Sequence, residues 1–329
     1  MALPDFKLLR PRTVIEAVQL LSAHAPSVQV IAGGTDLIPS LKQRLFTPDF
    51  VLDIRGIDEL RGISAVAGAG VEIGALTTIS QIEDSGFLQR NYSVLHEAAK
   101  TVSSPILRNM GTLGGNLCLD TRCLWYNQSL AWRKSCGFCL KNGGDICHVA
   151  PGGEKCWAAF SGDLAPALLC LDAELEIAGP QGFRRISVAD FYVNDGISPR
   201  LLQRGEIVTR VYLPESSAGW RGSYQKLRVR GAIDYPLTGI AAAIKLARGV
   251  VEDARVAVTG VNPAPMLVPN AEHALIGRTI DEHNALVVGE LAAKIAKPLT
   301  TSALTPEYRR EMVRIFAKRA VLAAAGGKA

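Results

Sequence analysis

The sequence predicts an α+β protein with two domains, and three observations support this. Near the N-terminus, short strand and helix patterns alternate with tight turns, which indicates a small mixed unit. From residue 183 strand patterns dominate, and the chain then ends in two long helical patterns at 279–296 and 305–325. The order of elements changes at residues 215–220. We therefore predict one domain over residues 1–217 and a second over 218–329.

The composition is typical of a folded protein that binds neither nucleic acid nor a membrane. Hydrophobic residues make up 48% of the chain and charged residues 20%, and the net charge of +5 is mild. No basic stretch is interleaved with stacking aromatics, and no run of about 18 apolar residues predicts a membrane span. Asp5, Lys7 and Arg10 lie where a signal peptide has its apolar region, so we expect a cytoplasmic protein with reduced thiols.

The elements of the first domain follow from apolar spacing and turn residues. Thr13 and Glu16 form a T-x-x-E capping box, which predicts a helix from there to Ala23. Further strands are predicted within 27–34, 50–54 and 70–79, and further helices within 37–45, 78–86 and 92–102. Residues 163–179 predict a helical turn and a strand, and the strand-rich region continues through 183–193 and 206–214.

The second domain is predicted to combine a sheet with helices. Residues 222–230 and 254–261 have strand patterns, whereas 238–249, TGIAAAIKLARG, fits either a strand or a helix. Thr305 and Pro306 are a good N-cap and N1 pair for the last helix.

Two turns with consecutive glycines are candidate ligand sites. IAGGTDL at residues 31–37 and GTLGGNLC at 111–118 would let backbone N–H groups point at phosphate oxygens. Neither turn matches a G-x-G-x-x-G or a Walker A motif. The alternative for the first is a plain strand-to-helix turn with Thr35 or Asp36 as the N-cap. Together, the two turns can serve one dinucleotide from two sides.

Four motifs in one order carry a family resemblance. They are IAGGTDL, then R-x-x-GTLGGNL from Arg108, then GDLAPALL at 162–169, then Y-x-K-x-R-x-R-x-x-x-D-Y-P from Tyr224. Over nearly its whole length the chain resembles the FAD-binding medium subunit of the xanthine dehydrogenase family of molybdenum hydroxylases. The resemblance implies a two-part PCMH-type FAD-binding domain, followed by an antiparallel-sheet-plus-helices domain like that of the CO dehydrogenase flavoprotein.

The resemblance also implies which residues bind FAD. The backbone of 31–37 would hold the pyrophosphate, the turn at 111–116 would line the flavin and its phosphate arm, and Asp163 would bond the ribityl hydroxyls. Lys226 would lie at the isoalloxazine edge, where a cation favours the reduced flavin; the alternative is a surface charge on an edge strand. The implied set is Val30, Ile31, Ala32, Gly33, Gly34, Thr35, Asp36, Leu37, Val102, Gly111, Thr112, Leu113, Gly114, Gly115, Asn116, Asp163, Val208 and Lys226.

Six of the seven cysteines lie between residues 118 and 156, in a segment that separates Asn116 from Asp163 by 46 residues. Clustered thiols suit zinc or an iron–sulfur cluster. Only one C-x-x-C pair exists, Cys136 with Cys139, and the other spacings are irregular. An electron carrier beside a flavin fits better than a redox-silent zinc ion.

The cysteine segment itself resembles the insertion in the β subunit of 4-hydroxybenzoyl-CoA reductase. The similar stretches are LCLDTRCLWYNQS, FCLKNGGDICHV and KCWAAFSGDLAPAL. This resemblance implies a [4Fe–4S] cluster in an insertion at about 119–160. Its ligands would be Cys123, Cys139, Cys147 and Cys156, which leaves Cys118, Cys136 and Cys170 free. Cys136 is the alternative ligand to Cys139. His148 is either a hydrogen-bond donor to the cluster or a structural histidine.

These resemblances imply an electron-transfer subunit with no catalytic acid or base. Ferredoxin would supply electrons through [4Fe–4S] and FAD to a [2Fe–2S] small subunit and a molybdopterin-binding large subunit, in a dimer of heterotrimers. There 4-hydroxybenzoyl-CoA would lose its phenolic hydroxyl as water in an anaerobic, aromatic-degrading bacterium. The alternatives are the FAD subunit of another molybdenum hydroxylase or dehydrogenase, and a zinc-stabilised flavin-binding module.

Overall fold

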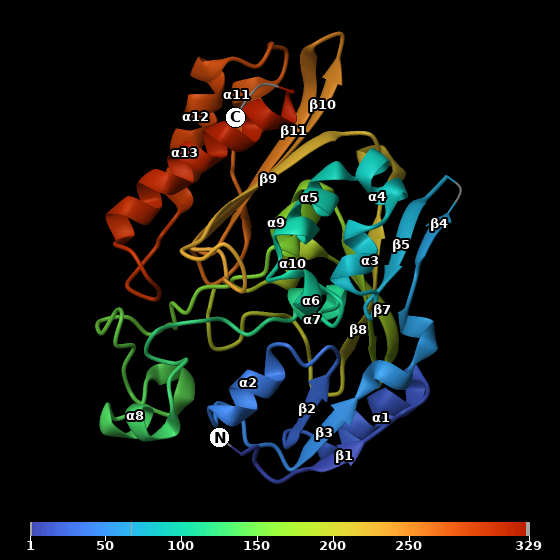
Figure 1. Ribbon diagram of the computed structural model, residues 1–329, viewed down its shortest axis with the longest axis vertical. Helices are drawn as coiled ribbons and strands as arrows, with labels where there is room; N and C mark the ends of the chain where they lie inside the picture. Colours follow the sequence, from blue (N-terminus) through green and yellow to red (C-terminus); the bar gives the residue numbers. More distant parts are fainter. Residues whose placement is uncertain (1, 67, 327–329) are drawn as a thin grey trace.

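Three β-sheets organise the chain, which a computed structural model describes over residues 2–66 and 68–326. The outermost residues of the two predicted domains, 1 and 327–329, lie outside that description. Figure 1 shows the N-terminal unit at one end, the strand-rich unit in the middle and the C-terminal sheet with its helices at the other end. The predicted α+β class is confirmed.

The three sheets differ in their strand direction. The first is parallel, in the order β1-β3-β2, and the other two are antiparallel, in the orders β4-β5-β8-β6-β7 and β12-β11-β10-β9. The strands are β1 (Lys7–Leu9), β2 (Val28–Ile31), β3 (Phe50–Asp53), β4 (Ile63–Val66), β5 (Gly70–Gly74), β6 (Glu174–Gly179), β7 (Gly182–Ser187), β8 (Ile207–Leu213), β9 (Arg221–Leu227), β10 (Thr238–Ala247), β11 (Val250–Thr259) and β12 (Met266–Leu267).

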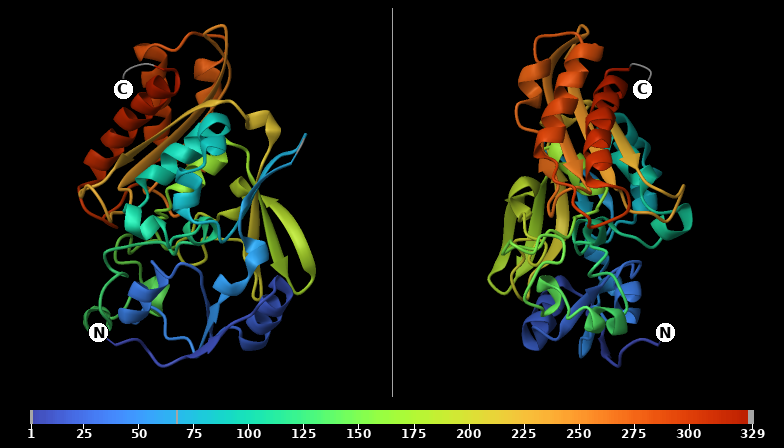
Figure 2. Two further views of the ribbon diagram at one scale, coloured as in Figure 1. Left: turned by 45° about the vertical axis from the view of Figure 1, so that its right-hand side comes forward. Right: turned by 90° about the vertical axis from the view of Figure 1, so that its left-hand side faces the viewer.

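The helices surround these sheets (Figures 1 and 2). They are α1 (Val14–His24), α2 (Leu37–Lys42), α3 (Ile79–Glu83), α4 (Gly86–Asn91), α5 (Ser93–Thr101), α6 (Pro105–Arg108), α7 (Leu113–Leu117), α8 (Leu130–Ser135), α9 (Leu164–Cys170), α10 (Val188–Phe191), α11 (Ala271–Leu275), α12 (Glu282–Ile295) and α13 (Pro306–Ala324). None of the helices in residues 2–66 and 68–326 is both long and apolar enough to cross a membrane. The sequence patterns did not predict β1, β4, β12, α4, α6, α7, α8 or α11, and α10 lies in the stretch 183–193 that was predicted to be strand-rich.

Two of the predicted caps can be compared with the structure. Thr13 caps α1 as predicted, since its hydroxyl accepts the Glu16 amide at 3.2 Å. The Glu16 carboxylate accepts the Arg12 amide at 2.7 Å instead of returning to Thr13, so the reciprocal half of the predicted capping box is wrong. Thr305 and Pro306 begin α13 as predicted.

The ambiguous segment TGIAAAIKLARG forms β10, a central strand, because both of its faces are buried. Ile240, Ala242 and Ile244 face the core under α12 and α13, whereas Ala241 and Ala243 face the core of the first domain. The period of two puts the small alanines on the second face, where α5 and α9 pack closely. Packing on both sides therefore overrides the low strand propensity of alanine.

Arg309 joins α13 to the rest of the second domain. Its fully buried guanidinium donates to the carbonyls of Leu237 at 3.1 Å, Gly260 at 2.7 Å and Leu299 at 3.0 Å. Burial lowers its pKa to about 10. The guanidinium therefore satisfies carbonyls at the start of β10, after β11 and before α13.

We expect Arg309→Met to lower the free energy of unfolding by about 3 kcal/mol, because buried carbonyls lose their donors. The urea midpoint measures this. Arg310→Met is the matched control, since Arg310 is exposed and makes one long bond to Ala296 at 3.4 Å; we expect a change within about 0.5 kcal/mol. Equal midpoints for both variants would contradict the role of Arg309.

Candidate functional site

A cavity of about 660 Å³ lies where the two glycine turns meet the strand-rich unit. Gly33 and the second turn approach closely: a Cβ on Gly33 would lie 1.9 Å from the Met110 carbonyl oxygen. Only glycine therefore fits at this position. Of the eighteen residues that the sequence predicts, fifteen line the cavity: Val30, Ala32, Gly33, Gly34, Thr35, Asp36, Leu37, Val102, Gly111, Thr112, Gly114, Gly115, Asn116, Asp163 and Val208.

Side chains of the second turn hold it against its neighbours. The Thr112 hydroxyl accepts the Gly115 amide at 3.1 Å and caps the short helix α7. The Asn116 side chain accepts the Leu164 amide at 3.1 Å, which fixes the turn to the start of α9. These bonds keep the backbone of the turn in place along the cavity wall.

Asp36 follows the first turn, and its carboxylate does not cap α2. Oδ1 of Asp36 accepts hydrogen bonds from the Tyr235 hydroxyl at 2.9 Å and from Arg122 at 2.8 Å, and the guanidinium lies 3.9 Å above the Tyr235 ring. Asp36 is thus the N-cap residue of α2, as the turn alternative predicted, but its side chain makes no capping bond. We call Asp36, Arg122 and Tyr235 the clasp, because they join the first turn, the cysteine segment and the second domain.

Three predicted FAD residues do not line the cavity. Lys226 is buried, although β9 is an edge strand, and its ammonium lies 2.9 Å from Asp163 Oδ2 and 3.1 Å from the Thr101 carbonyl. The Tyr224 hydroxyl donates to the other Asp163 oxygen at 2.8 Å. Lys226 is thus not a surface charge. Its ammonium is paired with Asp163, and Asp163 is the residue of this pair that lines the cavity. Ile31 packs under the first turn, and Leu113 lies in the core.

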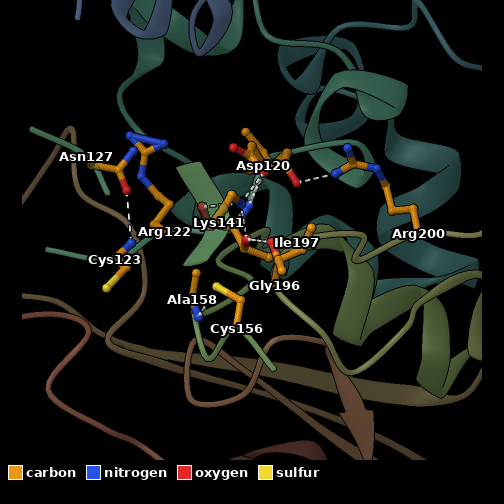
Figure 3. Close-up of polar contacts among 12 residues, drawn as sticks. Asp120, Arg122, Cys123, Asn127, Lys141, Cys156, Ala158, Gly196, Ile197 and Arg200 are labelled. Carbon is orange, nitrogen blue, oxygen red and sulfur yellow. Dashed lines mark hydrogen bonds and ion pairs between the residues drawn. The ribbon is translucent and has the colours of Figure 1, made fainter. Parts of the chain in front are cut away.

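The cysteine segment leaves and re-enters the domain beside this cavity. Arg122 and Ala159 exchange two backbone hydrogen bonds of 2.8 Å each, which close the segment at its neck. Asp120, Tyr126 and Lys141 of the segment line the cavity. The side chain of Lys141 is buried, and its ammonium forms an ion pair with Asp120 at 2.6 Å (Figure 3).

The four cysteines that the resemblance implies lie near one another. Cys123 and Cys156 share a small buried cluster, and Cys139 packs against it. Burial raises the pKa of Cys123 to about 11, and repulsion from Cys156 and Cys139 adds to this. Burial likewise raises the pKa of Cys156 to about 11, with further repulsion from Cys147 and Cys139 and an opposing effect of Lys141.

The other cysteines lie elsewhere. Cys136 ends α8 outside the buried cluster, Cys118 ends α7 at the cavity wall, and Cys170 is fully buried in the core. In residues 2–66 and 68–326, no group of three or more His, Cys, Asp or Glu side chains is arranged to hold a metal ion. The thiols are therefore neighbours that do not form a closed ligand set.

A buried cation lies beside the thiols. Arg133 is 2% exposed, and its guanidinium donates to the carbonyls of Gln43 and Arg44, just after α2, at 3.0 and 2.7 Å. Burial lowers the pKa of Arg133, while the negative charge that Cys139 would carry raises it. Among the residues that the structure describes, no carboxylate forms an ion pair with Arg133. Neutral oxygens satisfy this cation, since Arg133 also donates to the Gln128 carbonyl at 3.2 Å and to the Asn142 side chain.

His148 supports the fold of the segment. Its ring stacks on Trp125 at 4.5 Å, and Nε2 lies 2.6 Å from the Phe138 carbonyl oxygen. These contacts fix the loop before Cys139. The structural alternative for His148 therefore agrees with its observed contacts.

Sequence reasoning missed several residues of the site. Arg133 and Arg200 carried no recognisable signal, because each acts through contacts with distant segments; Arg200, for example, donates to the Leu119 carbonyl at 2.6 Å. Arg122 and Lys141 lay inside the quoted cysteine stretches, but their contacts with distant residues gave no local pattern. Tyr235 lay inside a quoted motif, and its place in that motif was the only available signal.

Comparison with known proteins identifies the family. Residues 4–216 match the FAD binding domain in molybdopterin dehydrogenase, and residues 222–324 match the CO dehydrogenase flavoprotein C-terminal domain. The chain is 29% identical to the carbon monoxide dehydrogenase medium chain of Afipia carboxidovorans, over 96% of each chain. It is 33% identical to the aldehyde oxidoreductase FAD-binding subunit PaoB of Escherichia coli, over 81% of this chain and 85% of that one.

The solved structures agree with these relatives. Carbon monoxide dehydrogenase from Hydrogenophaga pseudoflava, in a form that lacks the Mo-pyranopterin moiety, superposes with a TM-score of 0.81 at 27% identity over the whole of both chains. The predicted architecture, a PCMH-type FAD-binding domain followed by a CO dehydrogenase flavoprotein-like domain, is confirmed. The chain therefore belongs to the FAD-binding medium subunits of the molybdenum hydroxylase family.

Proposed function

We propose that this chain is the FAD- and [4Fe–4S]-binding electron-transfer subunit of a molybdenum-containing 4-hydroxybenzoyl-CoA reductase. The observation that carries the proposal is the position of the thiols beside the cavity: Cys123, Cys139 and Cys156 lie in or against one buried cluster, and Cys147 is near enough to Cys156 to repel its thiolate. Cys136 shares neither relation. An electron carrier there would lie next to the FAD.

The flavin site would use the residues named above. The backbone of the two glycine turns would face the phosphates, and Asp163 would meet the ribityl chain. Val102 and Val208, both largely buried at the cavity wall, would contact the ring. Lys226 would act through Asp163, because its ammonium is paired with that carboxylate. Burial raises the pKa of Asp163, and the Lys226 ammonium and the Tyr224 hydroxyl oppose that rise; the carboxylate would accept hydrogen bonds from the ribityl hydroxyls.

The cysteine site fits a group with negative charge. Ligation requires thiolates, and burial alone opposes them at Cys123 and Cys156. Arg133 and Lys141 supply two positive charges around the thiols.

The bound groups would supply single-electron transfer between ferredoxin and the partner subunits. The partners would be a [2Fe–2S] small subunit and a molybdopterin-binding large subunit, in a cytoplasmic dimer of heterotrimers. On the large subunit, two electrons and two protons would remove the phenolic hydroxyl of 4-hydroxybenzoyl-CoA as water. The described residues of this chain would bind and orient cofactors and would take no part in that chemistry.

Gly33→Ala is expected to reduce the FAD content of the purified complex at least tenfold, because the methyl group would meet the Met110 carbonyl. Flavin released on denaturation measures this. Gly152→Ala is the control, since a Cβ there meets nothing within 4 Å, and we expect full FAD content. A Gly33→Ala complex with normal FAD would refute the assigned turn.

Cys123→Ser and Cys139→Ser are each expected to remove about four irons and four acid-labile sulfides per copy of this chain, with FAD retained. Cys136→Ser is the matched control and is expected to keep them. Metal and sulfide analysis of the complex gives the result. Zinc in place of iron would support the zinc-stabilised module, and iron loss only in Cys136→Ser would overturn the ligand set.

Reduced ferredoxin is expected to reduce the FAD of the complex, and NADH to do so poorly, because the proposed reaction needs a low-potential donor. Flavin bleaching under anaerobic conditions, followed by benzoyl-CoA formation, measures both. Efficient turnover with NADH would contradict the proposed donor.

A further inference from the structure

Lys141 faces both the flavin cavity and the cysteine site. Its side chain is 5% exposed, lines the cavity, and carries the positive charge that acts on Cys156. The ammonium also lies 4.6 Å above the Tyr126 ring, which belongs to the same buried cluster as Cys123. The Lys141 ammonium therefore lies between the flavin cavity and the cysteine site.

Hydrogen bonds from Lys141 connect the segments that carry the cysteines. Its ammonium donates to Asp120 Oδ1 at 2.6 Å and to the carbonyl and hydroxyl of Thr121, two residues before Cys123. The Thr121 hydroxyl donates to the Gly196 carbonyl at 2.7 Å, and the Gly196 amide donates to the Cys156 carbonyl at 2.9 Å. Figure 3 shows Lys141 and Asp120 near Gly196 and Cys156.

Close packing around Gly196 prevents this hydrogen-bond network from shifting toward the thiols. A Cβ on Gly196 would lie 2.8 Å from the Cys156 sulfur and 3.1 Å from Ala158. The acceptors of the Lys141 ammonium are themselves held in place by hydrogen bonds. The positive charge therefore keeps a constant position relative to the thiols.

Resting on the proposed FAD and cluster sites, we propose that Lys141 is a positioning residue whose ammonium sets the electrostatic potential shared by those two sites. Asp120 partly compensates that charge, because it forms the ion pair but is itself 20% exposed to solvent. A fixed positive charge favours the more negative, reduced state of any nearby redox group, and a carboxylate disfavours it. The two residues therefore have opposite effects on reduction.

Removing each charge in turn tests this proposal. In the purified complex, Lys141→Met is expected to shift the midpoint potentials of the [4Fe–4S] cluster and of FAD to more negative values. Asp120→Asn is expected to shift both to more positive values, and Lys141→Arg to leave both nearly unchanged. EPR-monitored titration reports the cluster and visible absorption reports the flavin, while iron and FAD contents are measured on the same samples.

Each outcome decides the proposal. Opposite shifts in the two charge variants support it. Shifts in the same direction, or none in samples with full cofactor content, overturn it, because a merely structural role predicts no dependence on the sign of the charge. If Lys141→Met loses iron, the midpoint potentials of Asp120→Asn alone test the proposal. A wild-type complex that contains no [4Fe–4S] cluster would refute the proposed function instead. In that case the midpoint potential of the flavin in the two charge variants would test the role of Lys141.

Discussion

The hydrogen bond from the Leu164 amide to the Asn116 side chain determines where the cysteine segment sits. It holds the end of the second glycine turn against the start of α9, so the chain leaves and returns at one place. The paired backbone bonds between Arg122 and Ala159 tighten the same neck. A segment closed in this way cannot move far from the cavity, whatever its internal structure.

A second constraint determines how the two domains pack: the side chains on one face of the C-terminal sheet are small. Ala241, Ala243 and Ala257 present only methyl groups to α5 and α9, so that the sheet belongs to both cores. Helices α12 and α13 cover the other face, as Figure 2 shows. The ion pair of Lys226 with Asp163 crosses this same junction, and it is buried because the sheet and α9 lie so close.

Local signals in the sequence were enough for the parts of the fold that depend on local chemistry. The caps at Thr13 and Thr305 and the glycines of the two turns were visible because neighbouring residues determine them. The alanine-rich β10 was ambiguous because its strand state depends on two layers that pack on it. The three charged residues of the segment, Arg122, Arg133 and Lys141, were missed for a related reason. Their hydrogen-bond acceptors become neighbours only when the segment folds and packs against distant turns.

The clasp has a consequence for biosynthesis. Asp36 and Tyr235 are 199 positions apart in the chain, and Ile233, Asp234 and Tyr235 all line the proposed flavin cavity. Because the matched FAD-binding region ends at residue 216, that region alone lacks part of the wall of this cavity. A fragment cut at this boundary is an incomplete binding unit, and a ribosome must extend the chain well into the second domain before the pocket can close. With the flavin in this cavity, as proposed, its capture would be a late event in the synthesis of the chain.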